Sequence, residues 1–151
     1  MSADDDNWED MKNLWALAYH EAGHALVAVA CGGRVGAVRI NPQAGVTHVW
    51  FPETVDGYRG SALSSLAAAP AERLWLSETG THWPARERLL DQDPTGDRAT
   101  AAENLLEIPR PLRPRFAVAE TLAEALVRQH WAAIVQLADR LYRLRKVGPV
   151  T

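Results

Sequence analysis

Apolar positions along most of this chain follow the spacing of helices, and turn-forming residues separate the runs. The first run starts among residues 6–10 and continues to Cys31, where Gly32-Gly33 predicts the end of a helix. Residues 58–77 form a second run, rich in alanine and leucine, in which Pro70 should kink the helix or open another one. The first half of the chain is therefore expected to be mainly helical.

The second half of the chain predicts two further helices separated by a proline-rich segment. Residues 80–94 are expected to be irregular, and a turn after them leads into a helix over residues 97–107. Residues 108–114 contain three prolines, which favour an extended connector within the domain. The apolar stripe of residues 115–147 then predicts one long final helix.

Two short β-favouring runs stand between the first two helical regions. Residues 35–40 and 46–51 flank the turn-rich residues 41–45, and this pattern predicts a hairpin. The fold class is therefore predicted to be mainly α (α+β), a helical domain with a small β-hairpin or sheet after the first helix. With 151 residues the chain is expected to form a single domain over 1–151, in which residues 1–10 are a mobile tail.

Charge and cysteine content narrow the function classes. The net charge is −3 with both signs interspersed, so the chain lacks a basic footprint and no nucleic-acid partner is expected. Cys31 is the single cysteine, which excludes an internal disulfide and suits a cytoplasmic protein. The longest apolar stretch, residues 14–31, carries three ionisable side chains at its centre, so no membrane span is expected.

Those three side chains lie in the sequence His20-Glu21-Ala22-Gly23-His24. Residues four apart share one face of a helix, so His20 and His24 can offer ring nitrogens to one metal ion while Glu21 lies beside it. A single buried histidine is more often a hydrogen-bonded core residue than a ligand, but two on one face would compete for few acceptors. The pattern therefore predicts a zinc hydrolase site.

Zinc in a hydrolase is held by three protein ligands and keeps one open position, so a third ligand has to come from elsewhere in the chain. The metzincin pattern fails, because Val27 and Ala30 stand where it needs a glycine and a third histidine. Acidic residues downstream are the alternatives. They are Glu72, Glu78, Glu103, Asp91, Asp93 and Asp97.

Several of these segments together resemble the peptidase domain of FtsH, the AAA-type zinc metalloprotease. The resemblance is most specific over residues 18–26, and residues 45–47 agree with the family's hairpin. Residues 66–74 are similar to a helix that in the family has a glycine pair, which this chain replaces with alanines. Residues 95–101 resemble the segment that supplies an aspartate ligand, so the resemblance implies that Asp97 is the third ligand in a zincin-like fold.

The resemblance also implies a mechanism and a substrate strand. One Zn²⁺ per chain would lower the pKa of a bound water, and Glu21 would act as general base. The family binds substrate along a similar strand, so Val46, Thr47 and His48 are predicted substrate-binding residues. The function expected is thus a zinc-dependent metalloendopeptidase.

Three other side chains are candidates for supporting roles. His48 or His82 would stabilise the oxyanion that forms during hydrolysis, although such histidines more often lie at the surface. Trp50, on the second strand of the hairpin, would line a substrate pocket.

The resemblance breaks where FtsH proteins carry membrane anchors and an ATPase ring. This sequence has no phosphate-binding loop, so a stand-alone peptidase domain is expected, acting on peptides or unfolded chains. A separate ATPase partner or a homo-oligomer would fit the family. Two alternatives remain: a zinc peptidase dedicated to one regulator, as in ImmA-type proteins, and a non-catalytic zinc-binding or interaction module. The intact Glu21 argues against the last.

Overall fold

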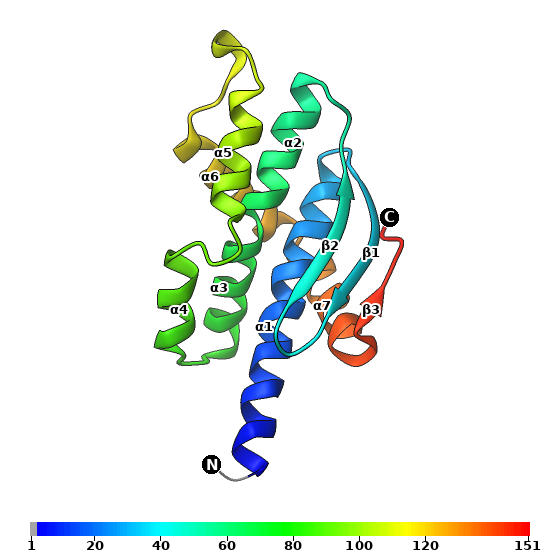
Figure 1. Cartoon of the computed structure of the whole chain (residues 1–151), viewed down its shortest axis with the longest axis vertical. Coiled ribbons are helices and arrows are strands. Elements are labelled where there is room, and N and C mark those ends of the chain that lie inside the picture. The colour runs from blue at the N-terminus through cyan, green and yellow to red at the C-terminus, as the bar shows by residue number, and fades with distance from the viewer. Residues whose placement is uncertain (1–2) are drawn as a thin grey trace.

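The computed structural model describes the backbone of residues 3–151 and the side chains of residues 7–151. Its longest element is helix α1 (Ala3–Ala30), which runs through the middle of the molecule (Figure 1). The sequence predicts a start among residues 6–10, but the helix already includes residues 3–10, because no proline or glycine interrupts them. The expected tail is thus helical from Ala3, and residues 1–2 of that tail lie outside the described residues.

The predicted hairpin is present and gains a third strand. Strands β1 (Arg34–Ile40) and β2 (Gly45–Trp50) pair antiparallel, and β3 (Lys146–Val147) pairs with the other side of β1. The order is β2-β1-β3, so among residues 3–151 no strand pairs with the outer edge of β2. The sheet lies alongside α1, and the edge strand β2 contacts that helix directly (Figure 1).

The predicted second helix is two helices, α2 (Val55–Leu66) and α3 (Ala68–Thr79), which meet at Ala67. Pro70 falls in the first turn of α3, where its missing N–H has no helical acceptor to lose. The prediction of an irregular segment over residues 80–94 is wrong in part. Helix α4 (Pro84–Asp91) forms there because a proline at the first position is well suited to start a helix.

The remaining elements are α5 (Asp97–Leu106), the short 3₁₀ helix η1 (Arg110–Leu112), α6 (Phe116–Gln129) and α7 (Trp131–Leu144). Helix α5 agrees with its prediction, whereas η1 interrupts the extended connector predicted for residues 108–114. The single helix predicted over residues 115–147 is also wrong, because the chain breaks at His130. The break lets α6 pack on α2 and α3 while α7 packs on α1, which one straight helix could not do.

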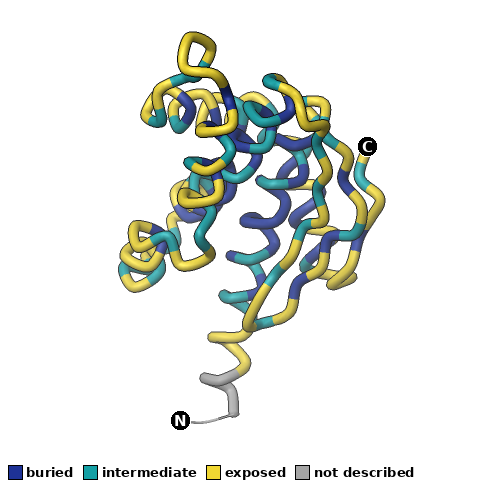
Figure 2. The backbone as a smooth tube through the Cα atoms, turned by 45° about the horizontal axis from the view of Figure 1, so that its top comes forward, coloured by how far each residue is buried: buried dark blue, intermediate teal, exposed yellow. Residues whose placement is uncertain are grey.

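Small side chains on α1 allow the other elements to approach it closely. Ala18, Ala22 and Ala25 are fully buried, and a Cβ atom on Gly23 would lie 2.8 Å from the Cβ of Ala71 on α3. Figure 2 shows that buried residues are concentrated on α1 and on the elements around it. A side chain at position 23 would therefore push α3 away from the helix that carries both histidines.

The fold class agrees with the prediction, since the structure is mainly helical with a small antiparallel sheet after the first helix. Within the described residues, no helix combines the length and the apolar character needed to cross a membrane.

Candidate metal centre

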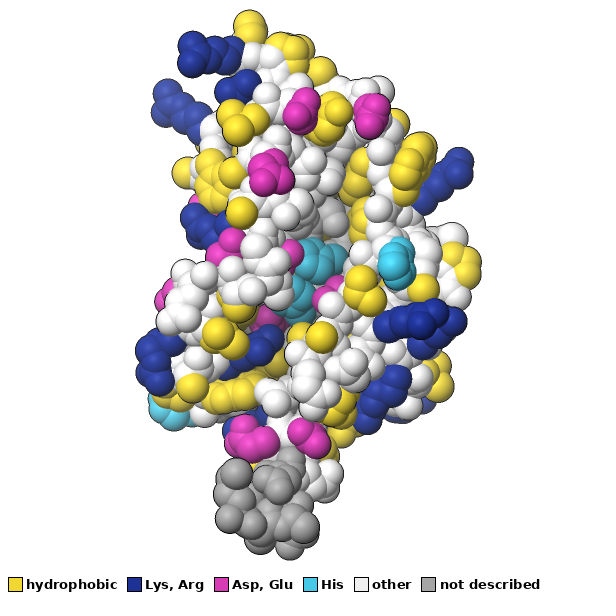
Figure 3. All heavy atoms as spheres, viewed as in Figure 1, with side chains coloured by type: hydrophobic (Ala, Val, Ile, Leu, Met, Phe, Trp, Pro, Cys, Tyr) yellow, Lys and Arg dark blue, Asp and Glu magenta, His cyan; other side chains and the backbone are white. Residues whose placement is uncertain are grey.

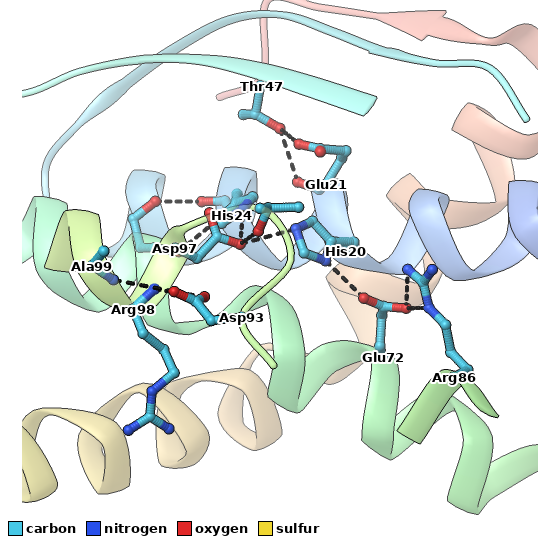
Figure 4. A network of polar contacts seen from close by, with 12 residues as sticks. His20, Glu21, His24, Thr47, Glu72, Arg86, Asp93, Asp97, Arg98 and Ala99 are labelled. Carbon is cyan, nitrogen blue, oxygen red and sulfur yellow. Dashed lines mark hydrogen bonds and ion pairs between the residues drawn. The ribbon is translucent and has the colours of Figure 1, made fainter. Parts of the chain in front are cut away.

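Two helices bring together three side chains of the types that bind metal ions. His20 and His24 lie one turn apart on α1, and Asp97 is the first residue of α5. Asp97 Oδ2 lies 3.0 Å from Nε2 of His20 and 3.3 Å from Nε2 of His24 (Figure 4). The donor atoms of the three residues lie within 4.8 Å of one another, and no second group of this kind occurs in the part of the chain that the structure describes.

Each histidine ring is fixed through its other nitrogen. Nδ1 of His20 lies 2.7 Å from Oε2 of Glu72, and Nδ1 of His24 lies 2.8 Å from the backbone oxygen of Ser64. Carbonyl and carboxylate oxygens only accept, so both Nδ1 atoms donate, and in the neutral rings Nε2 carries the free lone pair. Both lone pairs are thus directed toward Asp97, as ligation of one ion requires.

The position of Asp97 depends on the loop before α5. Asp93 and Gly96 both have left-handed backbone angles, with φ of 53° and 75°. The Asp93 carboxylate caps α5 by accepting from the backbone N–H groups of Arg98 and Ala99, at 2.9 and 3.3 Å. The hydroxyl of Thr95 donates to Asp97 Oδ2 at 2.7 Å. The loop therefore holds the carboxylate of Asp97 over the two rings.

The other acidic candidates for the third ligand have different surroundings. Glu72 contacts the nitrogen of His20 that faces away from Asp97, and Asp93 caps a helix. Asp91 pairs with Arg73 at 2.6 Å on the surface. Glu78 and Glu103 are exposed. Of the six alternatives, Asp97 is the one whose carboxylate faces both Nε2 atoms.

The donor set favours a positive charge. Burial opposes ionisation of the His20 ring, but hydrogen bonds to Asp97 and Glu72 outweigh it and raise the pKa of His20 to about 10. Burial likewise favours the neutral carboxyl of Asp97, but hydrogen bonds to His20 and His24 hold its pKa well below the usual range. Two imidazoles and one carboxylate are also ligands that zinc commonly takes in proteins. The residues present therefore fit a divalent metal ion.

Glu21 lies beside the donor set and under the edge strand. Its side chain is buried, and its carboxylate oxygen Oε2 accepts a hydrogen bond of 2.5 Å from the hydroxyl of Thr47 on β2 (Figure 4). A Cβ atom on Gly45 would lie 2.7 Å from Cγ of Glu21 and 2.8 Å from its Oε1. Strand β2 thus packs directly on the carboxylate, and a side chain at position 45 would displace it.

The predicted substrate-binding residues divide between the two faces of β2. Val46 and His48 are exposed, whereas Thr47 faces the interior and binds Glu21. His48 and His82 are both exposed, and neither has a polar contact with the donor set in the described structure. The geometry therefore gives Thr47 a contact with the acid, and gives the two histidines no contact that would support an oxyanion role.

An open pocket of about 430 Å³ lies beside His24 and Asp97. Its walls come from β2, α2 and α5, and they include Trp50, whose side chain is 58% exposed. Figure 3 shows histidine side chains at the bottom of a hollow in the middle of this face. Trp50 therefore lines a pocket next to the donor set.

The contacts that hold the two histidine rings are harder to predict from the sequence than the histidines and Asp97 themselves. Ser64 acts through its backbone oxygen, which no residue pattern reveals. Arg86, whose Nε and Nη2 atoms each lie 2.6 Å from Oε1 of Glu72, falls in a segment predicted to be irregular. A signal exists for Glu72, since a lone acid in the apolar residues 66–76 must find partners when it is buried.

Comparison with protein families identifies the class of the domain. Residues 5–76 match the sequence model of the Peptidase M50B-like family, so the chain contains a metallopeptidase-like domain. The matched segment is just under half of the chain and includes both histidines, Glu21 and Glu72 but not Asp97. The match does not single out FtsH-type proteins. No curated protein matches the sequence.

Proposed function

We propose that this protein is a zinc-dependent metallopeptidase that hydrolyses peptide bonds of peptides or unfolded chains. The observation that carries the proposal is the convergence of His20, His24 and Asp97, with their donor atoms within 4.8 Å and Glu21 beside them. The match to a peptidase family supports the reaction class, and the ligand types favour zinc. The resemblance to the FtsH peptidase domain adds the choice of an aspartate as third ligand.

In the proposed site His20, His24 and Asp97 hold the ion. Zinc, when bound, supplies a Lewis acid that polarises a peptide carbonyl and makes water a stronger acid. Glu21 takes the proton from the attacking water and passes it to the leaving amine. Thr47 donates to the Oε2 atom of Glu21 and so fixes the orientation of the carboxylate that takes this proton.

The edge of β2 suits an extended substrate. Its outer edge has no strand partner among the described residues, and exposed Val46 and His48 alternate along it with inward-facing Thr47. A peptide that adds to this edge as a further strand would pass over Glu21 and the donor set. Since strand addition needs an extended backbone, we propose peptides and unfolded chains as substrates. A separate ATPase partner would be needed to unfold and deliver folded proteins, and a homo-oligomer is the assembly that the family resemblance suggests.

The test compares the wild type with Glu21→Gln for zinc content and for cleavage of an unfolded, fluorescently labelled protein. The variant is expected to bind one zinc per chain and to lose hydrolysis by roughly 10²–10⁴-fold, the usual contribution of a general base. His20→Ala is expected to lose both. Cleavage by Glu21→Gln at the wild-type rate would contradict the role of Glu21, and a wild type without zinc would contradict the proposal as a whole.

A further inference from the structure

A chain of buried contacts extends from the His20 ring to α4. Glu72 Oε2 faces Nδ1 of His20 at 2.7 Å, and Glu72 Oε1 accepts a hydrogen bond of 2.6 Å from Nε of Arg86 and forms an ion pair of 2.6 Å with its Nη2. The Glu72 side chain is fully buried, and that of Arg86 is 14% exposed. The three residues come from α1, α3 and α4, so the contacts join three helices at the metal centre (Figure 4).

The two oxygens of Glu72 have separate tasks. One oxygen faces the histidine and the other lies against two nitrogens of one guanidinium, so each oxygen of the carboxylate has its own polar partner. Without Arg86, Oε1 would be a buried acceptor with no partner among the described residues, because Glu72 makes its polar contacts with His20 and Arg86. A buried carboxylate in that condition moves toward other donors or toward water.

The position of Arg86 is itself supported. Its guanidinium lies 5.8 Å from the ring centroid of Trp83, the residue directly before α4, and Nζ of Lys12 lies 4.7 Å from the same centroid. Cations over an aromatic face are attracted to it. The ring of Trp83 thus links α1 to the start of α4 and places Arg86 opposite Glu72.

We propose that Arg86 is a positioning residue of the metal centre: by fixing Glu72, it holds the His20 ring with Nε2 directed at the ion. This inference rests on the proposed metal site and not on turnover. Helix α4 is then a functional part of the centre, although it contributes no ligand. The effect expected is on metal affinity and ligand geometry.

The test is a double-mutant cycle on the affinity of the full chain for Zn²⁺, measured by competition with a chelator. Glu72→Gln is expected to weaken binding by roughly 10–100-fold, as outer contacts of metal ligands usually do, and Arg86→Met by about tenfold. In the Glu72→Gln background, Arg86→Met should change affinity by less than about twofold, since its route to the ion is already lost. Arg86→Lys should restore part of the loss, because an ammonium supplies one of the two donors.

Arg73→Met is the matched control. Arg73 joins the same two helices, α3 and α4, through Asp91 at 2.6 Å, but both side chains are far more exposed, at 46% and 75%, and neither touches a ligand. It should bind Zn²⁺ like the wild type, and its Co²⁺ form should keep the wild-type visible spectrum, which Arg86→Met should change.

The inference would be overturned if Arg86→Met bound Zn²⁺ with wild-type affinity. It would also be overturned if Arg86→Met lowered the Zn²⁺ affinity by the same factor with and without Glu72→Gln. Either result would hold even if the wild type is a peptidase. If the Zn²⁺ affinities follow the expected pattern but the wild type cleaves no substrate, the inference is supported and the proposed function is contradicted. Thermal unfolding of each metal-free variant shows whether it is folded. If Arg86→Met is unfolded, the same comparison of Zn²⁺ affinities is made with Arg86→Lys, with and without Glu72→Gln.

Discussion

The two histidines of the centre look equivalent in the sequence, but the structure holds them against different walls. His20 lies against the buried wall of α3 and α4, where its partner is a charged side chain, Glu72, that a second charge fixes in turn. His24 lies against α2 beside the open pocket, and its partner is the backbone oxygen of Ser64. A backbone partner is set by the fold, whereas a side-chain partner can be changed by one substitution. Substitution of the hydrogen-bond partner should therefore affect the proposed ligand His20 more than the proposed ligand His24.

The largest effect on zinc binding is expected from removing either histidine, whichever helices it lies against. His20→Ala and His24→Ala each leave two protein ligands, fewer than zinc sites in hydrolases use, so stoichiometric zinc and hydrolysis should both be lost. Metal analysis after dialysis, with the Arg73→Met variant as control, checks this. Full zinc content in either alanine variant would show that the ion is held elsewhere.

The next largest effect should distinguish the partner of His20 from the partner of His24. Glu72→Gln should weaken zinc binding by roughly 10–100-fold, whereas Ser64→Ala should change it by less than about threefold, because the acceptor for His24 is the backbone. The Ser64 hydroxyl donates to the backbone oxygen of His24, at 2.9 Å, and not to the His24 ring. Chelator competition measures both, and equal losses in the two variants would remove the distinction between a side-chain and a backbone partner.

A smaller effect should appear at Glu21, between the two walls. Thr47→Val keeps the shape of the side chain but removes the donor to the Glu21 carboxylate, so turnover should fall by roughly tenfold while zinc affinity is unchanged. Thr47→Ser, which retains the hydroxyl, is the matched control. Steady-state cleavage of a labelled peptide measures the effect, and wild-type turnover in the valine variant would mean that Glu21 needs no such contact.

The smallest effect should be on the pH dependence of stability without metal. Burial disfavours the charged His20 ring, but Asp97 and Glu72 raise its pKa from 6.5 to about 10. Because the folded protein binds this proton more tightly than the unfolded chain, protonated His20 stabilises the fold. The stabilisation is complete at pH values below the pKa of His20 in the unfolded chain, and it is lost as the pH rises through about 10. The melting temperature of the metal-free protein should therefore fall gradually from pH 7 to pH 10. His20→Gln should show a flatter curve, and parallel curves would contradict the assignment of this proton to His20.

How much the sequence predicts depends on how local each feature is. His20, Glu21 and His24 fall within one turn of a helix, so their mutual placement follows from helical geometry alone. The hairpin follows from two β-favouring runs and a turn. The strand β3 does not, because two residues near the C-terminus carry no periodic signal and pair with a strand far away in the sequence. The break between α6 and α7 has no proline or glycine to mark it, so packing on two different surfaces decides it.

The residues around the site are likewise only partly predictable from local sequence. Asp97 is suggested by a family resemblance, but its approach to the rings depends on the backbone of the loop before α5. Thr47 is predicted on the correct strand, yet the inward face that brings it to Glu21 is set by strand register and packing. Arg86 is beyond prediction, because its partner Glu72 is chosen by how α3 and α4 pack.

The most direct test of the central claim is a crystal structure of the zinc-loaded protein with anomalous diffraction recorded on both sides of the zinc absorption edge. We expect one zinc peak per chain, bonded to Nε2 of His20, Nε2 of His24 and the carboxylate of Asp97, with Glu72 still on Nδ1 of His20. A peak held by other residues, or no peak in crystals grown with excess zinc, would contradict the account.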